Sequence, residues 1–450
     1  MLRDSGLDLH VAMSGDGPRR VALERALREA ILSGRLAQDE RLPSTRALAS
    51  DLGLARGTVV EAYAQLAVEG YLVTRAGAAA RVGQAPAAFA RVDDRADPRR
   101  PPRHDLRVGS PDVAAFPREA WLRAMRTALR ETPDFALATS DPQGEPRLRA
   151  ALAAQLGRAR GVAVTPDRVL VCSGFSQGFS LLCRALHDRG VRRIGLEDPC
   201  VPDYPAIAVK SGLEVVPLAV DGEGAVPPGG DLGAVLVTPA HQFPLGATMS
   251  PSRRAALLEW ARARGALVIE DDYDGEFRYD RSPVGALQGL DPAHVAYAGT
   301  ASKTLAPGLR LGWLVLPPSL VAPVTTIKEL DDRHAPVLDQ IALAALIESG
   351  GFDRQVRRMR SRYRRRRDAL VAALREHRVL GIAAGLHAVV PVDAVEPVLA
   401  AAAERSLALS SLDDFRHSGT GDPALVIGYA TPPGHAYDAA LQALREALSQ

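Results

Sequence analysis

Lys303 is a side chain of this 450-residue chain that could bond covalently to an aldehyde, and it lies in the segment Ala298–Arg310. It is one of only three lysines among the 55 lysines and arginines. A neutral lysine amine is a nucleophile that condenses with an aldehyde to a Schiff base. Neighbouring hydroxyl and guanidinium groups bind phosphate, and here they belong to Thr300, Ser302 and Arg310. The segment predicts a site for a phosphorylated aldehyde, whereas a strand followed by a surface turn is the alternative explanation.

A second group of candidate residues lies upstream in Ala266–Asp274, an apolar run that ends in carboxylates. The run predicts a buried parallel strand with its acids at the carboxyl end, where open α/β sheets bind ligands. A carboxylate that faces a pyridine nitrogen keeps it protonated and makes the ring an electron sink. A tyrosine, here Tyr273, donates to the phenolic oxygen of the ring. Together with Lys303, this pattern predicts a pyridoxal 5'-phosphate (PLP) site. Asp271 and Asp272 remain alternatives for the nitrogen, because a shift of one residue changes the face of the strand.

The third component is a glycine-containing loop after the expected strand Val169–Cys172. The loop begins at Ser173 and leads into an apolar helix. Backbone N–H groups at a helix N-terminus form an anion site. We therefore expect the second side of the phosphate site to consist of the amides of Gly174, Phe175 and Ser176.

The N-terminal region has the pattern of a small DNA-binding module. Apolar residues at helical spacing predict a helix over 21–33, a second helix from Ser44, and a third that starts near Arg56 and packs through Val59, Val60, Tyr63 and Leu66. A strand at 70–74, a turn at Gly77 and a returning strand at 81–82 follow. Three short helices and a hairpin make a winged helix-turn-helix, whose third helix enters the major groove of DNA.

Several motifs in this order resemble one family, the MocR/GabR-type transcription regulators of the GntR superfamily. From about residue 104 onward, the chain resembles a fold-type I aminotransferase domain. The motifs are Leu42-Pro-Ser-Thr-Arg46, Arg56-Gly-Thr-Val-Val60, His241-Gln-Phe-Pro-Leu-Gly246, Glu270-Asp-Asp-Tyr-Asp-Gly-Glu-Phe277 and Ser302-Lys-Thr-Leu-Ala-Pro-Gly-Leu-Arg310.

The resemblance implies an α/β protein with a winged helix-turn-helix domain at residues 1–83, a linker at 84–103 and a PLP-binding effector domain at 104–450. Alternating strands and helices between 169 and 316 predict a mostly parallel sheet. A long helical stretch, Val337–Glu376, and a final α+β segment would form a small subdomain. A head-to-tail, domain-swapped homodimer is also implied.

The resemblance assigns a role to each candidate residue. Lys303 bonds the cofactor covalently, Asp271 pairs with the pyridine nitrogen and Tyr273 with the ring oxygen. His241 and Phe243 lie over or beside the ring. The phosphate is held by Thr300, Ser302, Arg310 and the amides of Gly174 to Ser176. Operator DNA is contacted by Arg46, Arg56 and Thr58, with Ser44 and Gly77 beside them.

Two departures from the family pattern bear on activity. Val201 stands where relatives have an aromatic residue against the cofactor, a place that Phe175 or Tyr204 could take. The expected strand Ala424–Tyr429 has no arginine, although aminotransferases hold the substrate carboxylate there. Without that guanidinium an α-amino acid loses its strongest fixed contact, unless Arg416 replaces it. The departures favour sensing over turnover.

Three hypotheses follow for the whole chain. The favoured one is a PLP-dependent regulator in which an amine effector changes DNA binding. The second is a regulator that senses PLP itself. The alternative from the enzyme class is an active aminotransferase that carries a DNA-binding module.

Composition sets further bounds. The net charge is only +2, so DNA binding depends on local patches. One such patch is the run 357–367, which reads as a solvated helix face or as a basic surface for DNA or a partner subunit. Three cysteines without metal-type spacing indicate a reducing compartment. No signal peptide or membrane-length apolar run is present, so we expect a cytoplasmic protein.

Overall fold

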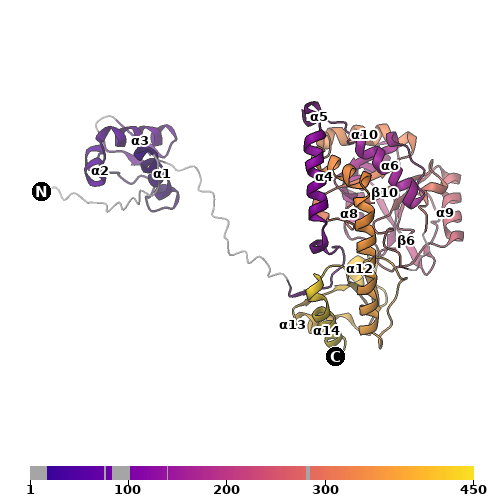
Figure 1. Cartoon of the computed structure of the whole chain (residues 1–450). Coiled ribbons are helices and arrows are strands. Elements are labelled where there is room, and N and C mark those ends of the chain that lie inside the picture. Colours follow the sequence, from indigo (N-terminus) through magenta and orange to yellow (C-terminus); the bar gives the residue numbers. More distant parts are fainter. Residues whose placement is uncertain (1–17, 76–77, 84–101, 139, 280–283, 450) are drawn as a thin grey trace. The chain divides into compact units, whose positions relative to one another are not determined.

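The computed structural model describes residues 18–75, 78–83, 102–138, 140–279 and 284–449. The chain divides into two compact units, Met1–Pro101 and Pro102–Gln450 (Figure 1). Among the helices in the described ranges, none is both long and apolar enough to cross a lipid bilayer.

The small unit contains the three predicted helices and the hairpin. The helices are α1 (Arg19–Leu32), α2 (Thr45–Leu52) and α3 (Arg56–Val68), and the hairpin pairs β1 (Leu72–Val73) with β2 (Arg81–Val82). Apolar residues at helical spacing form their common core, which includes Leu23, Leu27, Leu48, Val59 and Leu66. One packing prediction was wrong, because Val60 is exposed and not part of this core.

The large unit is built on an eight-stranded sheet. Its strand order is β4-β11-β10-β9-β8-β5-β6-β7. Strands β10, β9, β8, β5 and β6 are parallel to one another, whereas β11 is antiparallel to β4 and β10, and β7 is antiparallel to β6. The bounds are β4 Val169–Cys172, β5 Arg193–Asp198, β6 Glu214–Asp221, β7 Gly224–Ala225, β8 Ala234–Val237, β9 Leu267–Asp271, β10 Val295–Thr300 and β11 Gly312–Val315.

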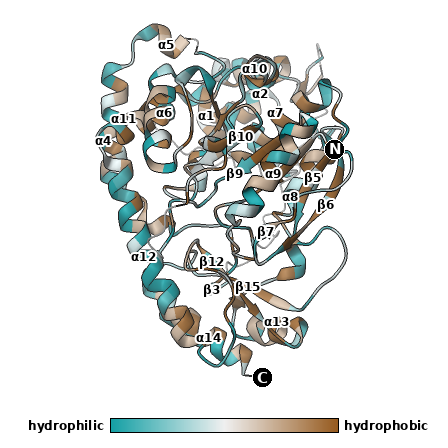
Figure 2. Ribbon diagram, turned by 90° about the vertical axis from the view of Figure 1, so that its right-hand side faces the viewer, coloured by the Kyte–Doolittle hydropathy of each residue, from teal (hydrophilic) through white to brown (hydrophobic). Residues whose placement is uncertain are grey.

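Helices enclose the sheet, which explains why its central strands have continuous apolar runs. All residues of β4, β8, β9, β10 and β11 are buried. Figure 2 shows that strands of the sheet such as β5 and β6 are largely hydrophobic, whereas α12 is largely hydrophilic. The helices of this unit are α4 Arg118–Glu131, α5 Asp134–Ala138, α6 Pro146–Arg160, α7 Phe175–Asp188, α8 Asp203–Lys210, α9 Pro251–Arg264, α10 Pro318–Asp332, α11 Val337–Glu348, α12 Gly351–Ala373, α13 Val395–Glu404 and α14 Tyr437–Leu448.

The C-terminal part forms the smaller α+β subdomain. Strands β12 (His387–Pro391), β15 (Ala424–Gly428) and β14 (Ser410–Ser411) make an antiparallel sheet. A second, parallel pair joins β3 (His104–Asp105) to β13 (Leu407–Ala408), so the start of the large unit is tied to its end.

The helical stretch expected over 337–376 is two helices in the structure. Helix α11 ends at Glu348 and α12 begins at Gly351. Between them Gly350 has a φ of 69°, a left-handed conformation that ends a helix and that glycine adopts without a Cβ penalty.

Candidate functional site

The register of the sheet brings the three predicted loops to one edge. Gly312, the first residue of β11, lies opposite Thr300 at the end of β10 and opposite Cys172 at the end of β4. Three parts of the chain therefore lie close together at this edge. They are the loop that begins at Ser173, the segment that follows Thr300, and Arg310. This register explains how residues far apart in the sequence come together.

A cavity of about 290 Å³ opens at this edge. Its walls come from the sheet, the N-terminus of α7 and the small subdomain, and they are mostly apolar or aromatic. The lining residues are Val108, Gly109, Ser176, Val201, Pro202, Tyr204, Phe243, Asp271, Tyr273, Lys303, Leu386, His387 and Phe415.

Lys303 is half-buried in this cavity, and its Nζ donates to the carbonyl oxygen of Gly109. Desolvation lowers the pKa of the amine, while Asp274 and Asp271 act in the opposite direction. A lowered pKa increases the fraction of the neutral amine, which is the form that reacts with aldehydes. The structure thus places a nucleophilic amine beside carboxylates.

The two adjacent carboxylates at the end of β9 have different surroundings. Asp271 lines the cavity, and its Oδ2 accepts a hydrogen bond from Tyr204 Oη at 2.8 Å. Desolvation raises the pKa of Asp271 to about 7. Asp272 accepts from Arg160 Nε at 2.7 Å, Arg160 Nη2 at 3.0 Å and Tyr297 Oη at 2.8 Å. Of the two acids, Asp271 is the one placed to meet a ligand.

Tyr273 belongs to a buried polar network on the same side of the cavity. Its Oη lies 3.0 Å from His241 Nδ1, which also lies 2.8 Å from Asp274 Oδ2. The network fixes the orientation of the Tyr273 hydroxyl. His241 itself is buried and is not among the lining residues of the cavity, unlike Phe243.

His387 is a cavity residue that the sequence reasoning did not find. It is the first residue of β12, its Nε2 lies 3.0 Å from Pro244 O, and its ring is 5.2 Å from that of His241. Desolvation lowers its pKa to about 3, so the ring is neutral. Because His387 is a single histidine in an apolar strand, the local sequence did not indicate that it lines a cavity.

The predicted phosphate-binding residues lie together at the N-terminus of α7. Gly174 has a φ of 85°, which would strain any other residue, and a Cβ at this position would press on the Arg310 guanidinium at 3.0 Å. Arg310 Nη2 donates to Ser173 O at 2.5 Å, and Thr300 Oγ1 donates to Ser302 Oγ at 2.9 Å. The positive N-terminus of the helix, a guanidinium and two hydroxyls make a set of donors that fits a phosphate.

The two aromatic residues considered as stacking partners pack against each other. The ring centroids of Phe175 and Tyr204 are 5.0 Å apart, and the Phe175 ring stacks on Phe179 at 5.7 Å. Tyr204 lines the cavity and holds Asp271, whereas the Phe175 side chain is not part of the lining.

The cavity carries no guanidinium among its described lining residues, and Lys303 is its single cation. Arg416, considered as a substitute, is paired with Asp413 at 3.0 Å. The site therefore has what a phosphorylated pyridine aldehyde requires and lacks a fixed partner for a substrate carboxylate.

The candidate DNA-binding residues lie at the N-termini of α2 and α3. Ser44 caps α2, because its Oγ accepts from Ala47 N at 3.2 Å, whereas Ala55 at the same position of α3 makes no side-chain cap. Arg46 and Arg56 are exposed and Thr58 is half-buried. Gly77 lies outside the described residues.

Comparisons with known proteins agree with both units. Residues 104–411 match the family described as aminotransferase class I and II, and residues 20–82 match the bacterial regulatory proteins of the gntR family. The α-aminoadipate aminotransferase LysN of Thermus thermophilus, solved with N-(5'-phosphopyridoxyl)-L-leucine, is 25% identical with a TM-score of 0.69. The match covers 77% of this chain and 92% of LysN.

Relatives of nearly full length combine both parts. The HTH-type pyridoxine biosynthesis transcriptional regulator PdxR of Corynebacterium glutamicum is 34% identical over 439 residues, which are 94% of this chain and 95% of PdxR. MocR of Rhizobium meliloti, named a probable rhizopine catabolism regulatory protein, is 36% identical over 388 residues, 80% of this chain and 78% of MocR. The chain thus belongs to the MocR/PdxR-type transcriptional regulators, in which a GntR-family helix-turn-helix region is joined to an aminotransferase class I and II domain.

Proposed function

We propose that this regulator binds PLP through Lys303 and that an amine effector, or PLP itself, changes how residues 1–83 bind operator DNA. The observation that carries the proposal is that Lys303 and Asp271 line the same cavity, whose described lining has no arginine. When bound, PLP supplies an aldehyde that reacts with primary amines and a ring that withdraws electrons.

The residues around the cavity divide the tasks of holding this cofactor. Asp271, fixed by the Tyr204 hydroxyl at 2.8 Å, is our candidate for the pyridine nitrogen. A positive ring nitrogen would stabilise the ionised carboxylate and lower its pKa from about 7. Tyr273, oriented by His241 at 3.0 Å, is the candidate donor to the ring oxygen.

The phosphate is assigned to the donors at the start of α7. Gly174, Phe175 and Ser176 offer backbone N–H groups, because the first amides of a helix have no intrahelical partner. Arg310, Thr300 and Ser302 add side-chain donors from the segment that follows β10.

The effector is proposed to be a primary amine without an essential carboxylate, or PLP itself. Apolar walls such as Val201, Leu386 and Phe415 surround the space next to Lys303. An α-amino acid would place its carboxylate there without a guanidinium partner, and burying such a charge is unfavourable. This argument favours sensing over the alternative, steady transamination.

A signal requires that the effector binds two conformations of the protein unequally. We propose that the protein works as a head-to-tail homodimer in the cytoplasm, where operator DNA is present. Ser44, Arg46, Arg56, Thr58 and Gly77 are the proposed DNA contacts, with α3 in the major groove.

The visible absorption spectrum tests the cofactor part. The full-length protein should show a PLP band that borohydride removes, and Lys303→Ala should lack it. If no band forms after PLP is added, the sensing proposal fails. Turnover of an amine with 2-oxoglutarate would favour the aminotransferase alternative.

A separate substitution tests the DNA part. Arg56→Ala should abolish operator binding in an electrophoretic mobility shift assay while the PLP band remains. Retained binding would show that α3 is not the recognition helix.

A further inference from the structure

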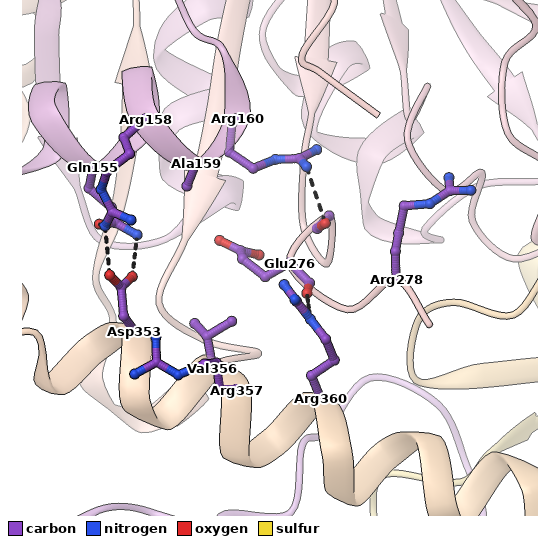
Figure 3. A pocket seen from close by; sticks show the side chains of 11 residues that line it. Gln155, Arg158, Ala159, Arg160, Glu276, Arg278, Asp353, Val356, Arg357 and Arg360 are labelled. Atoms are coloured by element: carbon purple, nitrogen blue, oxygen red, sulfur yellow. Dashed lines mark hydrogen bonds and ion pairs between the residues drawn. The ribbon is translucent and has the colours of Figure 1, made fainter. Parts of the chain in front are cut away.

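A second cavity, of about 560 Å³, lies between α6, α12 and the loop that follows β9 (Figure 3). It shares no lining residue with the cavity that contains Lys303 and Asp271, which we call the cofactor cavity. We call it the arginine pocket, after its five arginines: Arg158, Arg160, Arg278, Arg357 and Arg360.

Two of these arginines are neutralised by carboxylates of the protein. Arg160 binds Asp272 through two hydrogen bonds, and Arg158 Nη2 lies 2.6 Å from Asp353 Oδ2. A third, Arg360, donates from Nε to the backbone carbonyl of Glu276 at 2.8 Å. A carbonyl satisfies a donor but does not cancel its charge.

Arg357 has neither a hydrogen bond nor an ion pair with the other residues that the structure describes, and it is exposed. Within the lining, the charges of Arg357 and Arg360 are opposed by Glu276 and, for Arg357, also by Asp353, which already pairs with Arg158. Figure 3 shows the Glu276 side chain between α6 and α12, with arginines above and below it. The lining therefore carries an excess of positive charge around a central acid.

We propose that the arginine pocket binds a small oxyanion with two or more negative charges, of the phosphate or dicarboxylate type. Guanidinium groups bind both through paired N–H donors. The carboxylate of Glu276 occupies the centre of the pocket and competes with such a ligand. This site is independent of the cofactor.

The pocket should bind anions better when Glu276 is protonated. Desolvation and, to a smaller extent, the charge of Asp272 raise the pKa of Glu276 to about 7. When Glu276 is protonated, its carboxyl group no longer competes with the ligand for the positive charge of the arginines. The charged groups around this carboxyl are Arg158 and Arg160 from α6, Asp272, Asp274 and Arg278 from its own loop, and Asp353, Arg357 and Arg360 from α12.

Isothermal titration of the full-length, PLP-loaded protein tests the site, with pyrophosphate in one arm and succinate in the other, at constant ionic strength in chloride buffer. One of the two anions should bind. Arg357→Gln should weaken it about tenfold, because a charge-assisted hydrogen bond is lost. Arg358→Gln is the matched control, since Arg358 is the next residue of α12, is also exposed, and lies outside the pocket. Its effect should stay below about twofold, the size of a screened surface charge.

Both variants leave the phosphate-binding groups at α7 intact, so anion binding there cancels in the comparison. Glu276→Gln should strengthen binding and remove its increase between about pH 8 and pH 6. The proposal is overturned if neither anion binds, if Arg357→Gln and Arg358→Gln weaken binding equally, or if Glu276→Gln weakens it.

Discussion

The cofactor cavity and the arginine pocket are both lined by residues at or just after the end of β9, where two adjacent carboxylates differ in their partners. In the cofactor cavity, Lys303 and Asp271 both have pKa values shifted by desolvation, and no ion pair joins them in the described structure. The next residue, Asp272, is held by two hydrogen bonds from Arg160. The comparison indicates that paired buried charges hold the fold, whereas unpaired ones are available to a ligand.

The largest effect should come from breaking the buried ion pair between Asp272 and Arg160. Asp272→Asn should lower the free energy of unfolding by about 3–5 kcal/mol, because Arg160 would remain buried without its counter-ion. Denaturant unfolding followed by circular dichroism measures this. Asp271→Asn is the matched control, and an equal loss in both variants would contradict the distinction.

Asp271→Asn should instead affect the ligand. We expect the Kd for PLP to rise about thirtyfold, or about 2 kcal/mol, because a charge-assisted hydrogen bond to the pyridine nitrogen is lost. Titration of the cofactor-free protein with PLP, read by absorbance, gives the Kd. An unchanged Kd would remove Asp271 from its proposed role.

The pH dependence of the free energy of unfolding should also distinguish Asp271 from Asp272. The pKa of Asp271 is raised to about 7, so the folded state binds this proton more tightly than the unfolded state. The resulting stabilisation is complete below the unfolded pKa of about 4 and is lost as the pH rises through 7. Replacement by asparagine should flatten the slope of the cofactor-free protein by on the order of 1 kcal/mol per pH unit. Unfolding curves at several pH values give the slope of the free energy of unfolding against pH. If the Asp271 carboxyl is not desolvated, this slope should be the same with and without the substitution.

The smallest expected effect concerns the group that positions Asp271. Tyr204→Phe removes the hydroxyl that donates to this carboxylate at 2.8 Å. PLP binding should weaken about fivefold, which corresponds to the roughly 1 kcal/mol of one hydrogen bond. The same absorbance titration applies, and Tyr297→Phe, which removes a donor to Asp272, should leave the Kd unchanged.

Sequence reasoning found the parts of the site that have local signals. Lys303, Asp271 and Gly174 stand at the ends of strands, where the pattern of an open α/β sheet predicts ligands. The parallel sheet and the helix-turn-helix were predictable for the same reason, because apolar periodicity is a property of contiguous residues.

Long-range partners were not predictable. The choice between Asp271 and Asp272 depended on Arg160 and Tyr204, which reach β9 from other elements. The role of the arginine run of α12 also depends on a distant residue. Arg362 and Arg366 pair with the buried Asp112 at 2.5 and 2.9 Å. Part of this run therefore serves internal packing, which a charge pattern along one helix does not show.

The loop from Asp271 to Arg278 forms a wall of both cavities, with Asp271 and Tyr273 on one side and Glu276 and Arg278 on the other. If an anion in the arginine pocket changes the affinity for PLP by some factor, PLP must change the affinity for the anion by the same factor. The response of the regulator to each molecule would then depend on the concentration of the other.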